Sequence, residues 1–175
     1  MMKLAPEPTP ELHRPLEVAR VARLGSHEKI SADAKECAAL AKRFQVPKIH
    51  VVTAELKIQS WRGGGMKISG KAFIDLDQES VVSLEMFRST ASIPVERYFL
   101  NIPAGEDNES EQDIDPIVNG IINLGEVVAE TIALDLDPYP RMPGEAFEAI
   151  IEDDPANDEK PPNPFNVLKL RPDKT

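Results

Sequence analysis

The sequence has very little of what marks disulfide-bonded and membrane proteins. It has one cysteine, Cys37, so no disulfide can form within the chain. Cys37 lies in a helical pattern, which favours a buried and unreactive thiol. No run approaches the roughly 20 consecutive apolar residues that a membrane-spanning helix needs. Residues 1–6 lack the apolar core of a signal peptide, so we expect a cytoplasmic protein with no membrane partner.

The sequence also lacks the usual groupings of catalytic and metal-binding residues. His13, His27 and His50 fall in three different predicted elements, and none has a second His, Cys or carboxylate at metal-ligand spacing. There is no HExxH, CxxC or GxSxG pattern and no evident Cys–His pairing. We therefore expect a protein that is not an enzyme and that needs no metal and no cofactor.

Proline and charge are unevenly distributed along the 175 residues. Most of the 16 prolines lie at the two ends and around residues 138–143. Because Pro, Asp and Glu enrichment is typical of poorly ordered segments, we expect a disordered leader over 1–12. A single domain over 13–142 and an acidic, Pro-rich tail over 143–175 follow.

The net charge of −10 conceals two oppositely charged parts. Residues 1–103 have 15 basic and 12 acidic side chains, whereas residues 104–175 have 5 basic and 18 acidic ones. This asymmetry is compatible with a nucleic-acid or ribosome partner. The alternative is that the acidic part only keeps the protein soluble.

Helical spacing and capping residues predict two helices. Asp33 is a good N-cap for a helix over 34–44, which Pro47 ends. Apolar residues at helical spacing predict a second helix over 125–136, capped by Asn123 or Asp115.

The clearest pattern is a β-hairpin over residues 49–76. Val52, Ala54, Leu56 and Ile58 alternate with polar residues, and the same parity continues from residue 66 to residue 76. Three glycines, 63–65, predict the turn between the strands. This loop pairs Arg62 with Met66 and would place Lys57 opposite Lys71, where like charges repel.

Further strands are predicted on either side of the hairpin. Residues 13–23 and 26–31 precede it, and residues 81–84 and 88–100 add one or two strands after it, with Pro94 indicating an edge position or a bulge. Six acidic residues within 104–115 predict a disordered, solvated loop. The predicted fold class is α+β, with a mainly antiparallel curled β-sheet, or a partly open barrel, packed by two helices.

The polar face of the hairpin is a candidate RNA-binding surface. Aromatic rings among cations suit base stacking and phosphate contact, and the residues concerned are Lys57, Trp61, Arg62, Lys67 and Lys71. The alternative is that Trp61 and Phe73 pack beneath another element. The basic, glycine-rich turn is not followed by a helix, so a hairpin turn is favoured over a phosphate-binding loop.

A short apolar motif near the C-terminus is a second candidate interface. Phe165, Val167 and Leu168 follow the acidic stretch. They would bind a partner protein or dock back onto the folded domain.

Four segments resemble the YceD family of bacterial large-ribosomal-RNA accumulation proteins, over roughly residues 12–170. They are the hairpin at 53–70, ESVVSLEMF at 79–87, the helix and prolines at 123–140, and NPFNVL at 163–168. Ser80 and Ser83 stand where many members have cysteines, and Met86 replaces a proline.

The resemblance implies a non-enzymatic factor that supports 23S rRNA accumulation and large ribosomal subunit biogenesis in bacteria. Its partner would be ribosomal RNA, reached directly or within an assembly intermediate, and we expect no DNA partner. The alternative is an adaptor that holds a basic large-subunit ribosomal protein through its acidic C-terminal part. The family supplies no binding residues, so the candidate sites above rest on the chemistry of the side chains.

Overall fold

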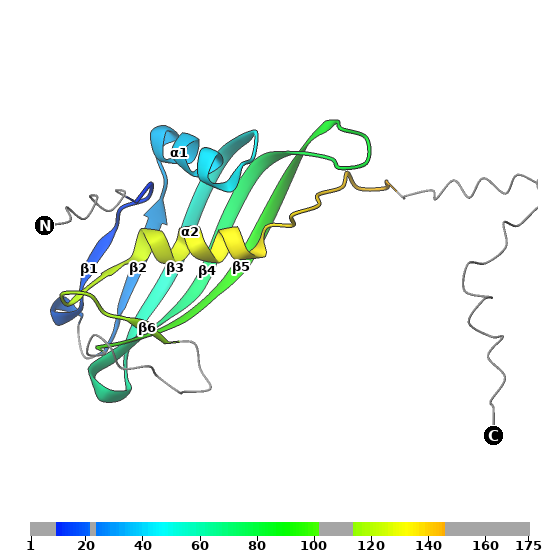
Figure 1. Cartoon of the computed structure of the whole chain (residues 1–175). Helices are drawn as coiled ribbons and strands as arrows, with labels where there is room; N and C mark the ends of the chain where they lie inside the picture. Colours follow the sequence, from blue (N-terminus) through cyan, green and yellow to red (C-terminus); the bar gives the residue numbers. More distant parts are fainter. Residues whose placement is uncertain (1–9, 22–23, 102–113, 146–175) are drawn as a thin grey trace, which may run out of the picture. The chain divides into compact units, whose positions relative to one another are not determined.

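The described part of the chain is built on one curled, mainly antiparallel sheet (Figure 1). The computed structural model describes residues 10–21, 24–101 and 114–145. The five strands lie in the order β2-β3-β4-β5-β6, and β5 and β6 are the parallel pair. Their bounds are β2 (Ser26–Ser31), β3 (Lys48–Trp61), β4 (Gly65–Glu79), β5 (Met86–Leu100) and β6 (Ile114–Pro116). The predicted α+β class is confirmed, and the sheet does not close into a barrel within these residues.

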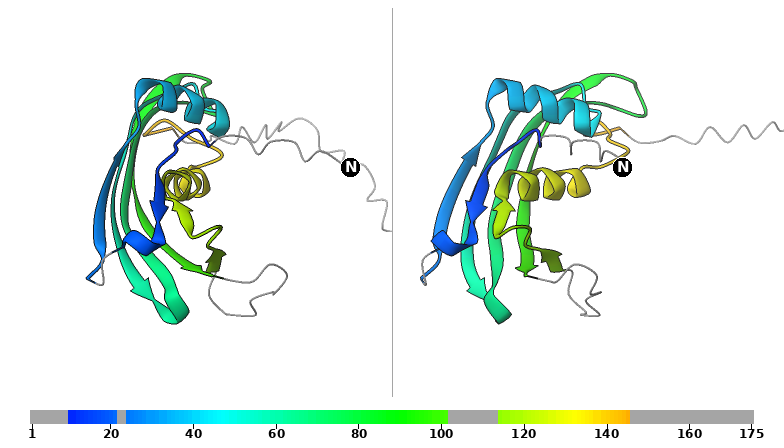
Figure 2. Two further views of the ribbon diagram at one scale, coloured as in Figure 1. Left: turned by 90° about the vertical axis from the view of Figure 1, so that its left-hand side faces the viewer. Right: turned by 60° about the vertical axis from the view of Figure 1, so that its left-hand side comes forward.

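Two helices and a two-stranded sheet fill the hollow of the curled sheet. The helices are α1 (Ala34–Phe44) and α2 (Leu124–Asp135), and the small sheet pairs β1 (Pro15–Glu17) with β7 (Ile121–Asn123). Figure 2 shows all of them on the concave side. We call the convex surface of β2–β5 the outer face. Within the described ranges, no helix has both the length and the apolar surface needed to cross a bilayer.

Alternation along the strands separates the core from the outer face. Even-numbered residues of β4, and of β3 from Val52 onward, point into the concave side, because side chains alternate along a strand. A bulge between Ile49 and Val51 shifts the alternation at the start of β3, where Ile49 is buried. The fully buried even-numbered residues include Val52, Ile58, Ile68, Ala72 and Ile74. α2 packs among them, and six of its twelve residues are buried: Leu124, Gly125, Val127, Val128, Ala129 and Ile132.

Local capping explains why α1 begins and ends as the sequence predicts. The Asp33 carboxylate accepts hydrogen bonds from the backbone N–H groups of Lys35 and Glu36, at 2.7 and 2.8 Å. The Glu36 carboxylate accepts one from Asp33 N–H, which completes a capping box. Gln45 closes the helix in the left-handed conformation, with φ of 57°.

The N-terminal segment packs on the first turn of α2. The Asn123 side chain caps α2 and accepts a hydrogen bond from Arg14 N–H at 2.8 Å. Leu12 is 0% exposed, and a Cβ at Gly125 would overlap its carbonyl oxygen. Leu12 therefore belongs to the core and not to a leader, although residues 1–9 lie outside the described ranges. A lone leucine among Pro and Glu has no periodic neighbours that would reveal its burial.

The register of the β3–β4 hairpin differs from the prediction. The turn is Arg62–Gly64 and not 63–65, with positive φ at Gly63 and Gly64. Trp61 therefore pairs with Gly65, which moves every later pair by two residues. Lys71 lies opposite Glu55, and Lys57 lies opposite Ser69, so the predicted repulsion between the two lysines is wrong. Because three glycines follow one another, the sequence alone does not show which residues form the turn.

Other predicted strands are corrected in length or position. β1 is three residues long, and a 3₁₀ turn follows it. Residues 80–85 form a turn, so residues 86–100 make one strand and not two. Pro94 lies on β5, which pairs with β6 only at residues 98–100, so its position is at an edge. Part of the predicted acidic loop, Ile114–Pro116, is β6, and residues 104–113 lie outside the described ranges.

Candidate nucleic-acid interface

No described helix covers the outer face, because α1 and α2 both lie on the concave side of the sheet (Figure 2). Its side chains come from odd-numbered positions of β3 and β4 and from even-numbered positions of β5. Trp61, Lys67 and Tyr98 lie at one end of this face, beside the β3–β4 turn. Phe73 is 39% exposed. Neither Trp61 nor Phe73 packs beneath another described element.

Two aromatic rings and two cations meet at the turn end of the outer face. The rings of Trp61 and Tyr98 have centroids 4.9 Å apart and planes inclined by 52°. The Arg62 guanidinium carbon lies 5.8 Å from the centroid of the Trp61 ring, and Lys67 Nζ lies 5.1 Å from that of Tyr98. These distances are within the range of cation–π attraction.

Glu96 binds two members of this group, Lys67 and Tyr98, and offsets part of the positive charge. Its Oε1 atom lies 3.1 Å from Lys67 Nζ and accepts a hydrogen bond from Tyr98 Oη at 2.5 Å. Contacts with Tyr98 and then with Glu96 raise the pKa of Lys67, and contacts with Tyr98 and then with Lys67 lower the pKa of Glu96. We call Trp61, Arg62, Lys67, Glu96 and Tyr98 the aromatic cluster.

The other two predicted RNA-binding residues lie on the same face but outside this cluster. Lys57 is exposed and lies between His27 of β2 and Ser69 of β4. Lys71 is exposed and lies opposite Glu55. The structure thus gathers Trp61, Arg62 and Lys67 in one cluster, where Tyr98 lies between Trp61 and Lys67, and places Lys57 and Lys71 farther along the sheet.

A shallow depression of about 500 Å³ lies on the outer face beyond Lys57. Its polar and aromatic walls include Lys29, Glu55, Lys71 and Phe73. Lys29 Nζ lies 2.7 Å from the Glu55 carboxylate, and this contact lowers the pKa of Glu55. With two lysines, Lys29 and Lys71, and one carboxylate, Glu55, in its lining, the depression is weakly positive.

Sequence reasoning missed Lys29, Glu96 and Tyr98 as members of this surface. Pro94 obscured the alternation in β5, so no face was assigned to its residues. The pattern that would have found Glu96 and Tyr98 is the buried series Ile93, Val95 and Phe99, because it turns these two residues outward.

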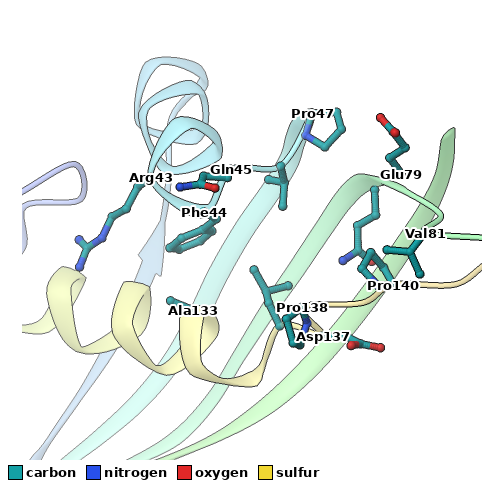
Figure 3. A pocket seen from close by; sticks show the side chains of 13 residues that line it. Arg43, Phe44, Gln45, Pro47, Glu79, Val81, Ala133, Asp137, Pro138 and Pro140 are labelled. Atoms are coloured by element: carbon teal, nitrogen blue, oxygen red, sulfur yellow. The ribbon is translucent and has the colours of Figure 1, made fainter. Parts of the chain in front are cut away.

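A larger pocket, of about 650 Å³, lies on the concave side between the ends of α1, α2 and β4 (Figure 3). Phe44, Ala133 and Pro138 give it apolar walls, and Gln78 and Glu79 supply polar groups. Its lining contains no His, Cys or Ser. Its charged residues are Arg43, Glu79 and Asp137.

The described residues contain no cluster suited to a metal ion. The nearest approach between a histidine and a carboxylate is at His50, whose Nε2 lies 2.9 Å from Asp77 Oδ1 without hydrogen-bond alignment. Cys37 is buried, as predicted, and burial raises the pKa of its thiol.

The second predicted interface, Phe165, Val167 and Leu168, lies outside the described residues and stays a prediction. Comparison of the chain with protein-family models, with curated proteins and with solved structures finds no match.

Proposed function

We propose that the protein is a non-enzymatic, cytoplasmic factor that supports accumulation of large-subunit ribosomal RNA by contacting pre-rRNA or an assembly intermediate. The observation that supports this most is the aromatic cluster on an open sheet face. Unpaired bases stack on exposed aromatic rings, while nearby cations contact phosphates. The resemblance to the YceD family supplies the ribosomal context.

Charge determines how such a contact would behave. The net charge of −10 repels RNA at long range, so attraction comes only from the basic side chains of the outer face. Each phosphate that they neutralise in single-stranded RNA lowers log K by about 0.7 per tenfold rise in salt. We therefore expect a moderate, salt-sensitive affinity.

The first test reverses three lysines of the outer face. Lys57→Glu/Lys67→Glu/Lys71→Glu in cells should reduce the level of large-subunit rRNA. A matched control, Lys35→Glu/Lys42→Glu/Arg141→Glu, makes the same change in net charge at exposed residues away from the outer face. An unchanged rRNA level in the first variant, with both proteins folded by circular dichroism, would show that the site is wrong.

The second test is recovery of RNA with the tagged protein. Large-subunit rRNA should be recovered at low salt and lost at high salt, and the triple reversal should lose it at both. Recovery of protein partners alone would contradict direct RNA contact.

The charge of residues 104–175 favours a second candidate function. With 18 acidic and 5 basic side chains, this part would attract a basic ribosomal protein. Phe165, Val167 and Leu168 would then anchor the partner. Deleting residues 143–175 should abolish its recovery, and recovery that survives the deletion and nuclease treatment would refute this version.

A further inference from the structure

We infer that the outer face binds a single-stranded segment of RNA along β4, from the aromatic cluster at the turn to a second stacking position at Phe73. This inference rests on the proposed function and deepens it, because it specifies the strandedness, the path and the length of the bound segment.

Phe73 supplies the second stacking position. It lies on the same face of β4 as Lys67, six residues farther along, because side chains alternate with a period of two. At about 3.3 Å per residue the two positions are about 20 Å apart. Phe73 is 39% exposed at the wall of the depression, so part of its side chain is accessible to a base.

Cationic side chains border the path between the two aromatic positions. Lys67, Lys57 and Lys71 follow one another along β3 and β4, and Lys29 lies across the depression. The two carboxylates on this stretch already have cationic partners, Glu96 with Lys67 and Glu55 with Lys29. A phosphate backbone along this path would therefore meet an excess of positive charge.

The path ends beyond Phe73, where carboxylates offset the cations of the outer face and the excess of positive charge ends. Asp75 and Asp77 are the next outward residues of β4. Arg88 lies 2.6 Å from Asp75, and His50 is the neighbour of Asp77. Since these carboxylates offer no site to a phosphate, a bound strand would not extend past them.

Aromatic stacking positions select single strands over duplexes. A duplex keeps its base faces stacked on one another, so only unpaired bases can use the two ring positions. A span of about 20 Å corresponds to about six nucleotide steps at a stacked rise of about 3.4 Å. The expected site size of about seven nucleotides lies at the low end for single-strand-binding folds.

Intrinsic fluorescence provides the test, because Trp61 is the only tryptophan of the chain. Oligouridylates of about 3 to 15 nucleotides, titrated into the full-length protein at low salt, should quench it. Affinity should rise up to about seven nucleotides and then level off. A duplex of similar length should bind at least about tenfold more weakly.

Phe73→Leu should weaken binding of the longer oligonucleotides by about 5-fold to 100-fold, the usual effect of losing one stacked base. It should leave the affinity for the shortest oligonucleotides unchanged, because these reach only the aromatic cluster. Phe73→Tyr should keep the wild-type affinity. Val51→Ala is the matched control, because Val51 is also 39% exposed but lies opposite Asp75, beyond the end of the path. Unchanged thermal unfolding would show that each variant is folded.

The outcomes separate this inference from the proposed function. Quenching that is insensitive to length, or to Phe73→Leu, would overturn the path and leave RNA contact at the aromatic cluster intact. Equal affinity for duplexes would overturn the single-strand preference. If no RNA binds or quenches the fluorescence, both the inferred path and the proposed function are overturned. The same holds if a protein, and not RNA, binds at this face.

Discussion

The two faces of the five-stranded sheet differ in what their residues do. On the concave face, even positions of β3 and β4 are buried by α1 and α2. On the outer face, the intervening positions hold lysines, carboxylates and two aromatic rings, Trp61 and Phe73, with no described element above them. The same two strands therefore specify the fold with one set of residues and present a binding surface with the other. Substitutions on the two faces should have separable effects.

The largest expected difference is between Leu56 and its neighbour Lys57. Leu56→Ala removes a buried side chain and should lower the free energy of unfolding by about 2–5 kcal/mol. Lys57→Ala changes an exposed outer-face residue and should stay within about 0.5 kcal/mol of wild type. Urea denaturation of both variants measures this. Similar losses in the two would mean that the faces are not independent.

A second contrast compares Gly70 with Ser69. A Cβ at Gly70 would overlap the carbonyl oxygen of Glu55 on β3, so the strands are close together there. Gly70→Ala should destabilise by about 1–3 kcal/mol, as overpacking does. Ser69→Ala, on the outer face, should have little effect. Equal thermal midpoints for the two variants would show that the sheet relaxes around the new methyl group.

The aromatic cluster is the place where the outer face should contribute to stability. A double-mutant cycle on Trp61→Ala and Tyr98→Ala should give a coupling of about 0.5–1.5 kcal/mol, since the rings are in contact. The same cycle with Trp61 and Phe73 is the control, because the effects of substitutions at distant residues on the free energy of unfolding are additive. Coupling in the control pair alone would contradict the geometry.

The smallest expected difference is between two ion pairs of equal length. Arg14–Glu36 and Lys29–Glu55 both measure 2.7 Å, but their side chains are 36% and 18% exposed in the first and 82% and 74% in the second. Exposed ion pairs contribute about 0.2–1 kcal/mol to the free energy of unfolding. We expect Arg14–Glu36 near the top of that range and no measurable coupling in Lys29–Glu55.

The pH dependence of the Arg14–Glu36 pair follows from the carboxylate. The hydrogen bond with Arg14 lowers the pKa of Glu36 in the folded state. Its contribution is therefore fully present above the ordinary Glu pKa of about 4.3 and is lost as the pH falls through the lowered folded-state pKa. Coupling measured with Arg14→Met and Glu36→Gln should be present at about pH 7 and nearly absent at about pH 2. A pH-independent coupling would mean that the interaction is not ionic.

Elements specified by local chemistry could be predicted from the sequence. α1 begins and ends as expected because Asp33, Glu36 and Gln45 act within a few residues of the helix ends. The alternation in β3 and β4 likewise assigned their buried face correctly. β6 and β7 were missed because three residues hold too little pattern, and the partners that stabilise them are distant in sequence.

The candidate site was predicted in part for the same reason. Trp61, Arg62 and Lys67 could be grouped because they flank one turn. Tyr98 and Glu96 join them through the β4–β5 register, which depends on tertiary packing and not on local sequence. The two-residue shift in the hairpin likewise replaced the expected Lys57–Lys71 repulsion with a pairing of Lys71 and Glu55.

The pairing of β1 with β7 has a consequence for the order of folding. The β3–β4–β5 meander forms through tight turns, whereas the hydrogen bond from Arg14 to Asn123 joins residues 109 positions apart. Closing so long a loop costs more entropy and is slow, so local hairpins should form first. During synthesis, β1 emerges before every other strand but has no partner until β7 has left the ribosome. The N-terminal segment should therefore be the last part of the domain to become protected from hydrogen exchange.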